Sequence, residues 1–323
     1  MNEIENNEYF LQEHRLPQAY LETARRYFDP LVRALIALFR EQQSKALLVS
    51  LSGCQGSGKS TLADYLRYSL IKLGINTINV SLDDFYLSKR ERQNRAQSIH
   101  PLFRTRGVPG THNTQRLINT LRCAKHGKLS GEALPRFDKL CDDLMPESEW
   151  ITVDESPSVF ILEGWCLGAE AVDESELLAP CNTFEETKDP DGQWRSAVNR
   201  FLRADYHLIN SLFDVQLFLK APGFESVFEW RLEQEEKLQK RLADEKGGTA
   251  IEASKPSGMS KEQVREFIQY YQRITEHLLA TLPSKADVVW ELDDHRQVVA
   301  MSVSEQLKRY VPNNNNEMDR KVD

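Results

Sequence analysis

The sequence predicts an α/β protein of the P-loop nucleotide-binding type, with a parallel sheet of about five strands and helices on both faces. Three observations support this prediction. A short apolar run at residues 46–52 leads directly into a glycine-rich loop and a helix, and a second strand follows that helix. Further short apolar runs occupy 158–164, 214–221 and 286–292. Runs of this kind are typical of strands buried on both faces, and strand–helix–strand connections predict parallel neighbours.

Composition narrows the class of protein. The chain has 323 residues, a net charge of −8 and a pI near 5.5, which argues against a general nucleic-acid binder with a basic surface. It contains no apolar run long enough for a membrane span, and its acidic start MNEIENNEYF is unlike a targeting peptide. Five scattered cysteines without a C-x-x-C pair favour free thiols. We expect a cytoplasmic protein without nucleic-acid or membrane partners, and leave its oligomeric state open.

Three regions are expected along the chain. Residues 1–45 form an N-terminal helical extension, because Leu31, Leu35, Leu38 and Phe39 have the spacing of a core-facing stripe. Residues 46–310 form the P-loop domain. Residues 311–323, VPNNNNEMDRKVD, contain few apolar side chains and are predicted to be disordered.

The helices of the P-loop domain follow from local patterns. The stretch TLADYLRYSLIKLG predicts a helix that ends at Gly74 as its C-cap. An acidic stretch at 170–193 is predicted to be a surface excursion. A strongly charged helix is expected from residue 230, then a flexible break at 247–258, and then a helix opened by Ser260 as its cap.

The strongest local signal is GCQGSGKS at residues 53–60, which fits G-x-x-x-x-G-K-[ST] between an apolar strand and a helix. Glycines let backbone N–H groups surround phosphate oxygens, and the helix start adds its positive end. Lys59 is expected to reach the β- and γ-phosphates as a catalytic residue, and Ser60 to bind Mg²⁺. The expected nucleotide-binding residues here are Gly53, Cys54, Gln55, Gly56, Ser57, Gly58, Lys59, Ser60 and Thr61.

Acidic residues follow two other predicted strands at the same edge of the sheet. Glu163 ends the stretch VFILEG, and Asp83 and Asp84 end the strand after the P-loop helix. Ligands of open parallel sheets bind at these carboxyl ends. We expect Glu163 to serve Mg²⁺ directly or through water. Asp83 is expected near the metal, where it accepts a proton from an attacking hydroxyl, with Asp84 in support; a simple turn is the alternative.

These acids fit a kinase that acts on an alcohol better than a switch GTPase. A GTPase would carry the guanine-reading motif N-K-x-D, and the nearest match, TKDP at 187–190, has proline where the aspartate belongs. ATP is therefore the expected nucleotide.

Basic residues between 89 and 106 mark a candidate acceptor site in this acidic chain. For Lys89 to Arg95 a solvated helix face is an equally good interpretation. FRTRGVPGTHNTQRL differs, because its arginines adjoin a constrained turn where they suit a carboxylate or phosphate held by two hydrogen bonds. The segment PRFDK also places basic residues around an aromatic side chain. A single histidine such as His112 is more often a capping or packing residue than a catalytic one. The substrate-binding candidates are Asp84, Tyr86, Arg104, Arg106, His112, Arg136, Asp138 and Lys139.

The order of several motifs resembles the D-glycerate 3-kinase family, relatives of uridine kinase, phosphoribulokinase and pantothenate kinase. The matching stretches are GCQGSGKST, SLDDFYL, RGVPGTHN, PRFDK, ILEGWCLG, VNRFL and WRLEQE. The resemblance covers roughly residues 46–297 and leaves out the N-terminal 45 residues and the 170–193 segment. It implies Asp83 as the catalytic acid, Glu163 as the Mg²⁺-associated acid, and a lid in which Arg231 closes on the phosphates of ATP.

The sequence thus predicts ATP- and Mg²⁺-dependent phosphorylation of a small anionic alcohol, most simply D-glycerate. Two other functions stay open: a kinase for a different small alcohol, such as a nucleoside or a pantothenate-like compound, and a regulatory ATP-binding protein that is not a kinase. Asp83 distinguishes the regulatory ATP-binding protein from the two kinases, since a binding protein needs no general base.

Overall fold

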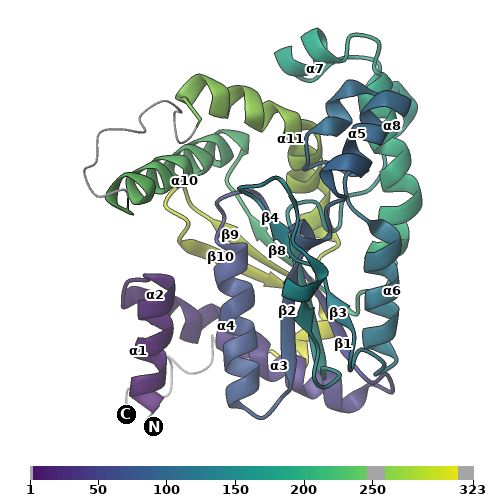
Figure 1. The fold of residues 1–323 in the computed structure, drawn as a ribbon. Coiled ribbons are helices and arrows are strands. Elements are labelled where there is room, and N and C mark those ends of the chain that lie inside the picture. Colours follow the sequence, from purple (N-terminus) through teal and green to yellow (C-terminus); the bar gives the residue numbers. More distant parts are fainter. Residues whose placement is uncertain (1–2, 246–258, 312–323) are drawn as a thin grey trace.

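A computed structural model of the chain describes residues 3–245 and 259–311. Its centre is a six-stranded sheet with the order β10-β9-β8-β1-β7-β2 (Figure 1). The expected flexible break at 247–258, and all of the expected disordered tail except Val311, lie outside the described residues.

All five predicted strands are present, and they run parallel. They are β1 (Leu47–Gly53), β2 (Thr77–Ser81), β7 (Val159–Gly164), β8 (Val215–Lys220) and β9 (Val288–Leu292). The sequence prediction missed β10 (Val298–Val303), which pairs antiparallel with β9 at the edge of the sheet. An edge strand exposed on one side lacks the continuous apolar run that identifies a buried parallel strand.

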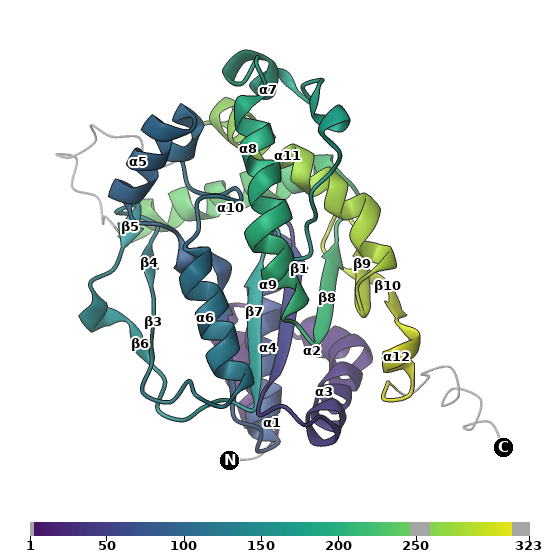
Figure 2. The same cartoon turned by 90° about the vertical axis from the view of Figure 1, so that its right-hand side faces the viewer.

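Helices cover both faces of the sheet and create two cores. Val49, Ile161 and Leu217 face one core, where α3 (Asp29–Glu41) and α4 (Lys59–Lys72) pack. Leu48 and Phe160 face the other, which is covered by α6 (Thr114–Lys125), α8 (Gln193–Phe201) and part of α11 (Lys261–Thr281) (Figure 2). Alternate strand residues therefore bury both sides, as expected for a sheet between two helical layers.

The other α-helices and two small ribbons complete the described part of the chain. The helices are α1 (Glu3–His14), α2 (Ala19–Thr23), α5 (Lys89–Ser98), α7 (Thr183–Lys188), α9 (His207–Ser211), α10 (Phe224–Glu245) and α12 (Glu305–Lys308). Two small ribbons are formed by β3 (Ala133–Leu134) with β6 (Ile151–Thr152), and by β4 (Phe137–Asp138) with β5 (Asp143–Leu144). No helix in the described part of the chain has the length and apolar content needed to cross a membrane.

The N-terminal helices pack directly on the sheet. Leu31 and Leu35 of α3 are fully buried, as the apolar stripe predicts. The Phe28 ring packs edge-on against Trp290 of β9 at 5.6 Å between centroids, and the Tyr65 hydroxyl of α4 donates to Asp29 at 2.7 Å. The N-terminal extension therefore contributes side chains to the core that supports the P-loop helix.

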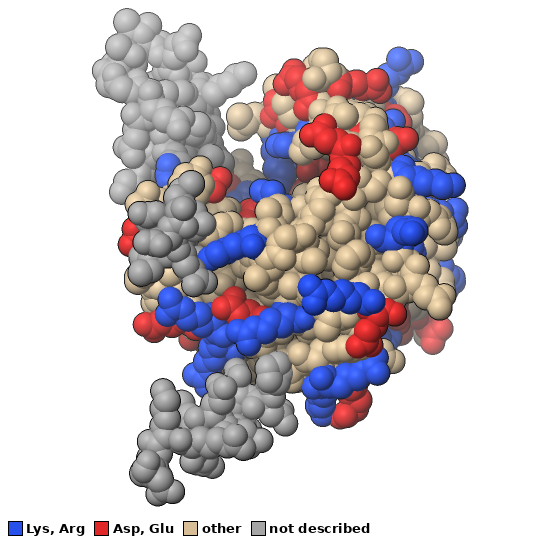
Figure 3. Space-filling model, turned by 90° about the horizontal axis from the view of Figure 1, so that it is seen from below, with Lys and Arg blue, Asp and Glu red and all other residues tan. Residues whose placement is uncertain are grey.

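Charge is distributed unevenly over the surface. Figure 3 shows Lys and Arg side chains in a band on the face seen from below. Basic residues occupy the last turns of α3, α4 and α6, among them Arg40, Lys72 and Lys125. Cations there complement the negative ends of the helix dipoles. The predicted site lies at the opposite ends of the strands.

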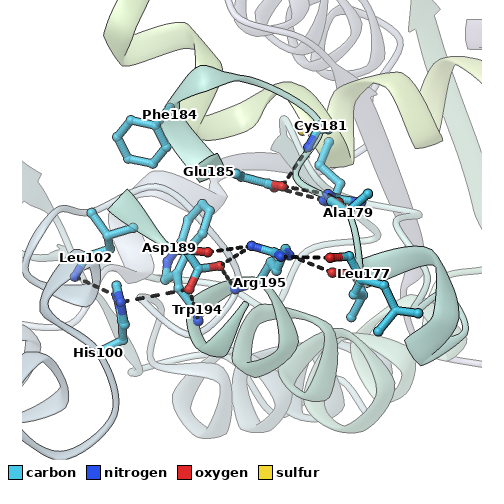
Figure 4. A network of polar contacts seen from close by, with 12 residues as sticks. His100, Leu102, Leu177, Ala179, Cys181, Phe184, Glu185, Asp189, Trp194 and Arg195 are labelled. Carbon is cyan, nitrogen blue, oxygen red and sulfur yellow. Dashed lines mark hydrogen bonds and ion pairs between the residues drawn. The ribbon is translucent and has the colours of Figure 1, made fainter. Parts of the chain in front are cut away.

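Buried ion pairs anchor the acidic 170–193 segment. Asp189 and Arg195 are both buried and lie 3.0 Å apart, and the Arg195 Nε atom donates to the Leu177 carbonyl at 2.7 Å (Figure 4). Glu185 of α7 is also buried and accepts from the Arg273 Nε atom of α11 at 2.8 Å. The surface excursion expected from the sequence is therefore fixed to α8 and α11.

Candidate active site

The P-loop follows β1 and turns into α4 through two glycines with positive φ. Gly56 has φ +80° and Gly58 has φ +89°, a conformation that side chains with a Cβ atom rarely adopt. A Cβ atom on Gly56 would also lie 2.7 Å from the Trp230 Cβ atom of α10. Since α4 starts at Lys59, the loop presents backbone N–H groups and a helix N-terminus at one place, as a phosphate site requires.

Glu163 of β7 lies close to both Lys59 and Ser60. Its Oε1 atom accepts from the Ser60 hydroxyl at 3.0 Å, and its Oε2 atom lies 3.9 Å from the Lys59 Nζ atom. Glu163 is only 6% exposed, and Oε2 has no hydrogen-bond partner among the described residues. A buried carboxylate oxygen without a partner is costly, and one beside a hydroxyl suits a hard cation. The residues present therefore fit Mg²⁺.

Asp83 lies on a 3₁₀ turn (Leu82–Phe85) directly after β2. Its Oδ2 atom accepts from the Lys139 Nζ atom at 2.6 Å. Burial disfavours the charged carboxylate, but the positive charges of Lys139 and Lys59 hold the pKa of Asp83 below its usual value. Asp83 is therefore ionised at neutral pH, and it can accept a proton once its ion pair with Lys139 loosens.

Asp84 faces a different part of the protein from Asp83. Its Oδ1 atom accepts from the Phe137 backbone at 3.2 Å and lies 3.8 Å from the Arg136 Nε atom. Burial raises the pKa of Asp84 despite these contacts. Two neighbouring acids thus have opposite pKa shifts, and only Asp83 contacts Lys139.

The arginines of the RGVPG turn have different surroundings. Arg106 forms an ion pair with Asp142 and lies over the Phe137 ring at 5.4 Å, so it is partly neutralised. Arg104 is exposed, and within the described ranges its guanidinium has no hydrogen bond or ion pair. The structure brings Arg106, but not Arg104, into contact with the ribbon that carries Lys139.

The PRFDK segment provides the ribbon facing these acids. Arg136 is exposed and lies near Asp84, whereas Lys139 reaches Asp83. Asp138 accepts from the Leu140 and Cys141 backbones at 2.7 and 3.2 Å, so it organises the turn after β4. Its carboxylate is therefore engaged locally.

Arg92 of α5 was predicted as part of a segment that equally well forms a solvated helix face, yet its side chain is fully buried. Its guanidinium donates to the carbonyls of Leu87 and Arg104 at 3.1 and 3.0 Å and lies 3.0 Å from the Asp142 carboxylate. Arg92 thus joins the end of the Asp83 segment, the RGVPG turn and the PRFDK ribbon.

His112 is buried beside Tyr86, and their rings stack at 4.4 Å between centroids. Burial lowers the pKa of His112 to about 3, so the ring is neutral. The Tyr206 hydroxyl pairs with the His112 Nδ1 atom. The His112 Nε2 atom is buried and has no hydrogen-bond partner among the described residues, so it is available to a ligand.

Trp165 and Tyr271, which the sequence analysis did not single out, fix the RGVPG turn. The Trp165 indole donates to the Gly107 carbonyl at 2.9 Å, and Tyr271 of α11 packs edge-on against Trp165 at 4.9 Å. Gly107 has φ +143°, and a Cβ atom there would lie 2.3 Å from the Tyr271 hydroxyl. Only glycine allows this close approach of α11 to the turn.

Arg231, the proposed lid residue, is on α10. Its guanidinium donates to Glu235 at 2.7 Å and lies over the Phe267 ring at 5.6 Å. A residue that sequence reasoning missed, Arg296, donates from its Nε atom to the Gly56 carbonyl of the P-loop at 2.8 Å. No motif marks Arg296, because it reaches the P-loop from the turn after β9.

A cleft of about 710 Å³ opens beside Ser60, Glu163 and Asp84 and runs along the free edge of β2. The β3–β6 ribbon forms its opposite wall. The ionisable residues that line it are Asp64, Arg67, Asp84, Arg136, Asp154, Glu155 and Glu163. Acids therefore outnumber cations in the cleft, whereas Lys59 and Lys139 adjoin Asp83 outside it.

Comparison with known proteins identifies close relatives, although no family model matches the chain. A kinase of Schizosaccharomyces pombe described as uncharacterized is 32% identical over 285 residues, 82% of this chain and 96% of the yeast protein. The chloroplastic D-glycerate 3-kinase of Arabidopsis thaliana is 28% identical over 272 residues, 78% of this chain and 54% of the plant protein. The structure of D-glycerate 3-kinase from Cryptococcus neoformans has a TM-score of 0.64 at 23% identity, covering 84% of this chain and 96% of that one, which shows the same fold.

The mostly parallel sheet, the P-loop and these relatives define the class of protein: it is a P-loop kinase, an ATP-dependent enzyme that acts on a small molecule. Within that class, the chain belongs to the same kinase family as the Schizosaccharomyces pombe protein, and it is similar in sequence to the plant D-glycerate 3-kinase.

Proposed function

We propose that this kinase transfers the γ-phosphoryl group of ATP to a hydroxyl of D-glycerate. The observation that carries the proposal is the Asp83–Lys139 pair, a carboxylate and an ammonium group 2.6 Å apart after the strand next to β7. A hydroxy acid needs both groups, because its hydroxyl loses a proton while its carboxylate must be neutralised in a closing site. The Arabidopsis relative named for D-glycerate supports the same substrate.

In the proposed reaction the acceptor hydroxyl attacks the γ-phosphorus, the bond from phosphorus to the β,γ-bridging oxygen breaks, and the proton passes to Asp83. The products are a phosphoglycerate and ADP. Lys59 stabilises the charge that develops on the transferring group. Ser60 and Glu163 would hold Mg²⁺, which neutralises phosphate charge when bound.

Lys139 has two roles in this proposal. Without acceptor it pairs with Asp83. When glycerate binds, its carboxylate competes for the lysine, and Asp83 is left free to take the hydroxyl proton. Arg106 donates to the Lys139 backbone carbonyl at 3.3 Å, and its guanidinium, which also pairs with Asp142, is the second cation of the proposed site. His112 contributes a neutral ring nitrogen.

A second candidate substrate is a larger, uncharged alcohol such as a nucleoside. The cleft beside Asp84 favours it, because its volume of about 710 Å³ exceeds the needs of a three-carbon acid and acids outnumber cations among its ionisable lining residues.

The test measures ADP release and product formation by purified protein with Mg·ATP and D-glycerate, in parallel with uridine, pantothenate and other hydroxy acids. Turnover that depends on D-glycerate supports the proposal. Clear turnover of an uncharged alcohol without turnover of glycerate would refute the anionic acceptor and leave the kinase intact.

A further inference from the structure

The turn between β9 and β10 contacts the P-loop through one side chain. Arg296 has φ +63°, a left-handed conformation that is uncommon for arginine. Its Nε atom donates to the Gly56 carbonyl at 2.8 Å, and its terminal nitrogen forms an ion pair with Glu233 of α10. The guanidinium also lies over the Trp230 ring at 5.4 Å. One side chain therefore contacts both the P-loop and the helix that carries Arg231.

The contact with Gly56 bears on phosphate binding. Gly56 has φ +80°, and its carbonyl accepts from the Arg296 guanidinium while Trp230 packs against its Cα side. A charge-assisted hydrogen bond from Arg296 stabilises one orientation of the carbonyl.

The same turn also holds α10 in place. The Trp230 indole donates to the Asp294 carbonyl at 2.7 Å, and the Ser226 hydroxyl donates to the Asp294 carboxylate at 2.7 Å. Trp230 in turn packs so closely on Gly56 that only glycine fits there. Residues 294–296 therefore contact both the P-loop and the start of α10, which also contact each other.

We propose that Arg296 is a positioning residue that couples nucleotide binding on the P-loop to the placement of α10, and thereby of Arg231. Loss of Arg296 frees the Gly56 peptide and Glu233 together. The proposal rests on the ATP-dependent kinase activity, and not on the identity of the acceptor.

The experiment measures ATP and ADP affinity by calorimetry in the absence of acceptor, so that its result does not depend on D-glycerate. The variants are Arg296→Ala, Arg296→Lys, Glu233→Gln, Arg231→Ala and the double variant that combines Arg296→Ala with Arg231→Ala. Arg309→Ala is the matched control, because Arg309 also lies over an aromatic ring, Tyr310, and near a carboxylate, Glu41, at 3.8 Å. Melting temperatures are measured for every variant, and affinities are measured well below them.

We expect Arg296→Ala to weaken ATP binding by about tenfold or more, equivalent to about 1.4 kcal/mol. Arg296→Lys should recover only part of this, because an ammonium cannot reproduce the planar guanidinium contacts. Arg309→Ala should bind ATP like the parent protein. The losses from Arg296→Ala and Arg231→Ala should be non-additive in the double variant, since coupled sites share one interaction.

Three results would overturn the proposal: parental ATP affinity in Arg296→Ala, full recovery by lysine, or additive losses with Arg231→Ala. If Arg296→Ala does not fold, the ATP affinities of Arg296→Lys and Glu233→Gln test the proposal instead. Parental ATP affinity in both variants would refute the positioning role of Arg296. A lowered melting temperature with unchanged affinity would show that Arg296 only stabilises the fold.

Discussion

The Lys139 Nζ atom lies 2.6 Å from the Asp83 Oδ2 atom, and Asp84, the next residue, turns away to the backbone of Phe137. The two acids of one short turn are thus assigned to different partners. Because their partners differ, we expect substitutions of the two acids to have different effects.

Asp83→Asn should lower kcat by about 10²- to 10⁴-fold, the usual contribution of a general base, with little change in ATP affinity. Asp84→Asn is the matched control and should cost less, because Asp84 supports the ribbon at Phe137. Steady-state kinetics with saturating ATP and acceptor check both variants. A larger loss for Asp84→Asn would mean that the two roles are reversed.

Lys139→Met should move the acid limb of the kcat/KM profile to higher pH. Lys139 is the largest of the influences that lower the pKa of Asp83 against the opposing effect of burial, so its removal raises that pKa. A base with a raised pKa loses its proton-accepting form at a higher pH as the solution is acidified. The KM for the acceptor should also rise, and an unshifted acid limb would argue that Asp83 is not the titrating base.

Glu163→Gln and Ser60→Ala should increase the Mg²⁺ concentration needed for half-maximal activity. Glutamine keeps the shape of Glu163 but removes the charge from its unpartnered buried oxygen. The fold should therefore stay as stable in the absence of metal, or become more stable. Magnesium titrations and melting curves measure the two effects, and unchanged Mg²⁺ dependence in both variants would remove these residues from the metal site.

Arg106→Ala should raise the KM for D-glycerate strongly and leave the KM for ATP nearly unchanged. Arg106→Lys should recover little, since lysine lacks the two-pronged geometry. Arg104→Ala is the control, because Arg104 is exposed on the same turn and contacts no acid within the described ranges. Equal effects of the two alanine variants would indicate general electrostatic attraction instead of a specific contact.

Arg195→Met should destabilise the protein by about 3–5 kcal/mol, because it removes the guanidinium 3.0 Å from the buried Asp189 carboxylate and leaves the His100 ring, at 3.9 Å, as the nearest ionisable group. Calorimetric ATP affinity below the melting temperature should be unaffected, since this pair lies outside the P-loop contacts. Urea unfolding measures the loss, and a change below about 1 kcal/mol would show that backbone donors alone satisfy Asp189.

The parallel strands and their helices were predictable because their signals are local. The run ahead of Gly53 and the one that ends at Glu163 are apolar over a whole strand, and the P-loop spacing requires a helix after Lys59. Glu163 pairs in register with both Leu51 and Ser81, so the expected meeting of strand ends also followed from parallel topology. By contrast, β10 is half exposed and antiparallel, so its sequence lacks the continuous apolar run that identifies a buried strand.

Side-chain partners were much less predictable. Arg106 is paired with Asp142, which lies 36 positions further along the chain, and Tyr206 reaches His112 across 94 positions. Such contacts depend on how loops fold over the sheet. They cannot be predicted from the period of apolar residues or from motif spacing, because both describe only neighbouring positions in the sequence. Arg296 was missed for the same reason, since its contact with Gly56 spans 240 positions.

The buried Arg92 has a consequence for the redesign of acceptor specificity. Its guanidinium contacts three segments, at Leu87, Arg104 and Asp142, that would otherwise be exchanged one at a time as separate loops. A chimera that imports only the turn at 104–110 from a relative would have to keep the backbone carbonyl of residue 104 in the same place, or leave a buried cation short of a partner. Residues 87–142 are therefore best transplanted as a single cassette, and natural divergence of acceptor choice in this family should have changed this region as a block.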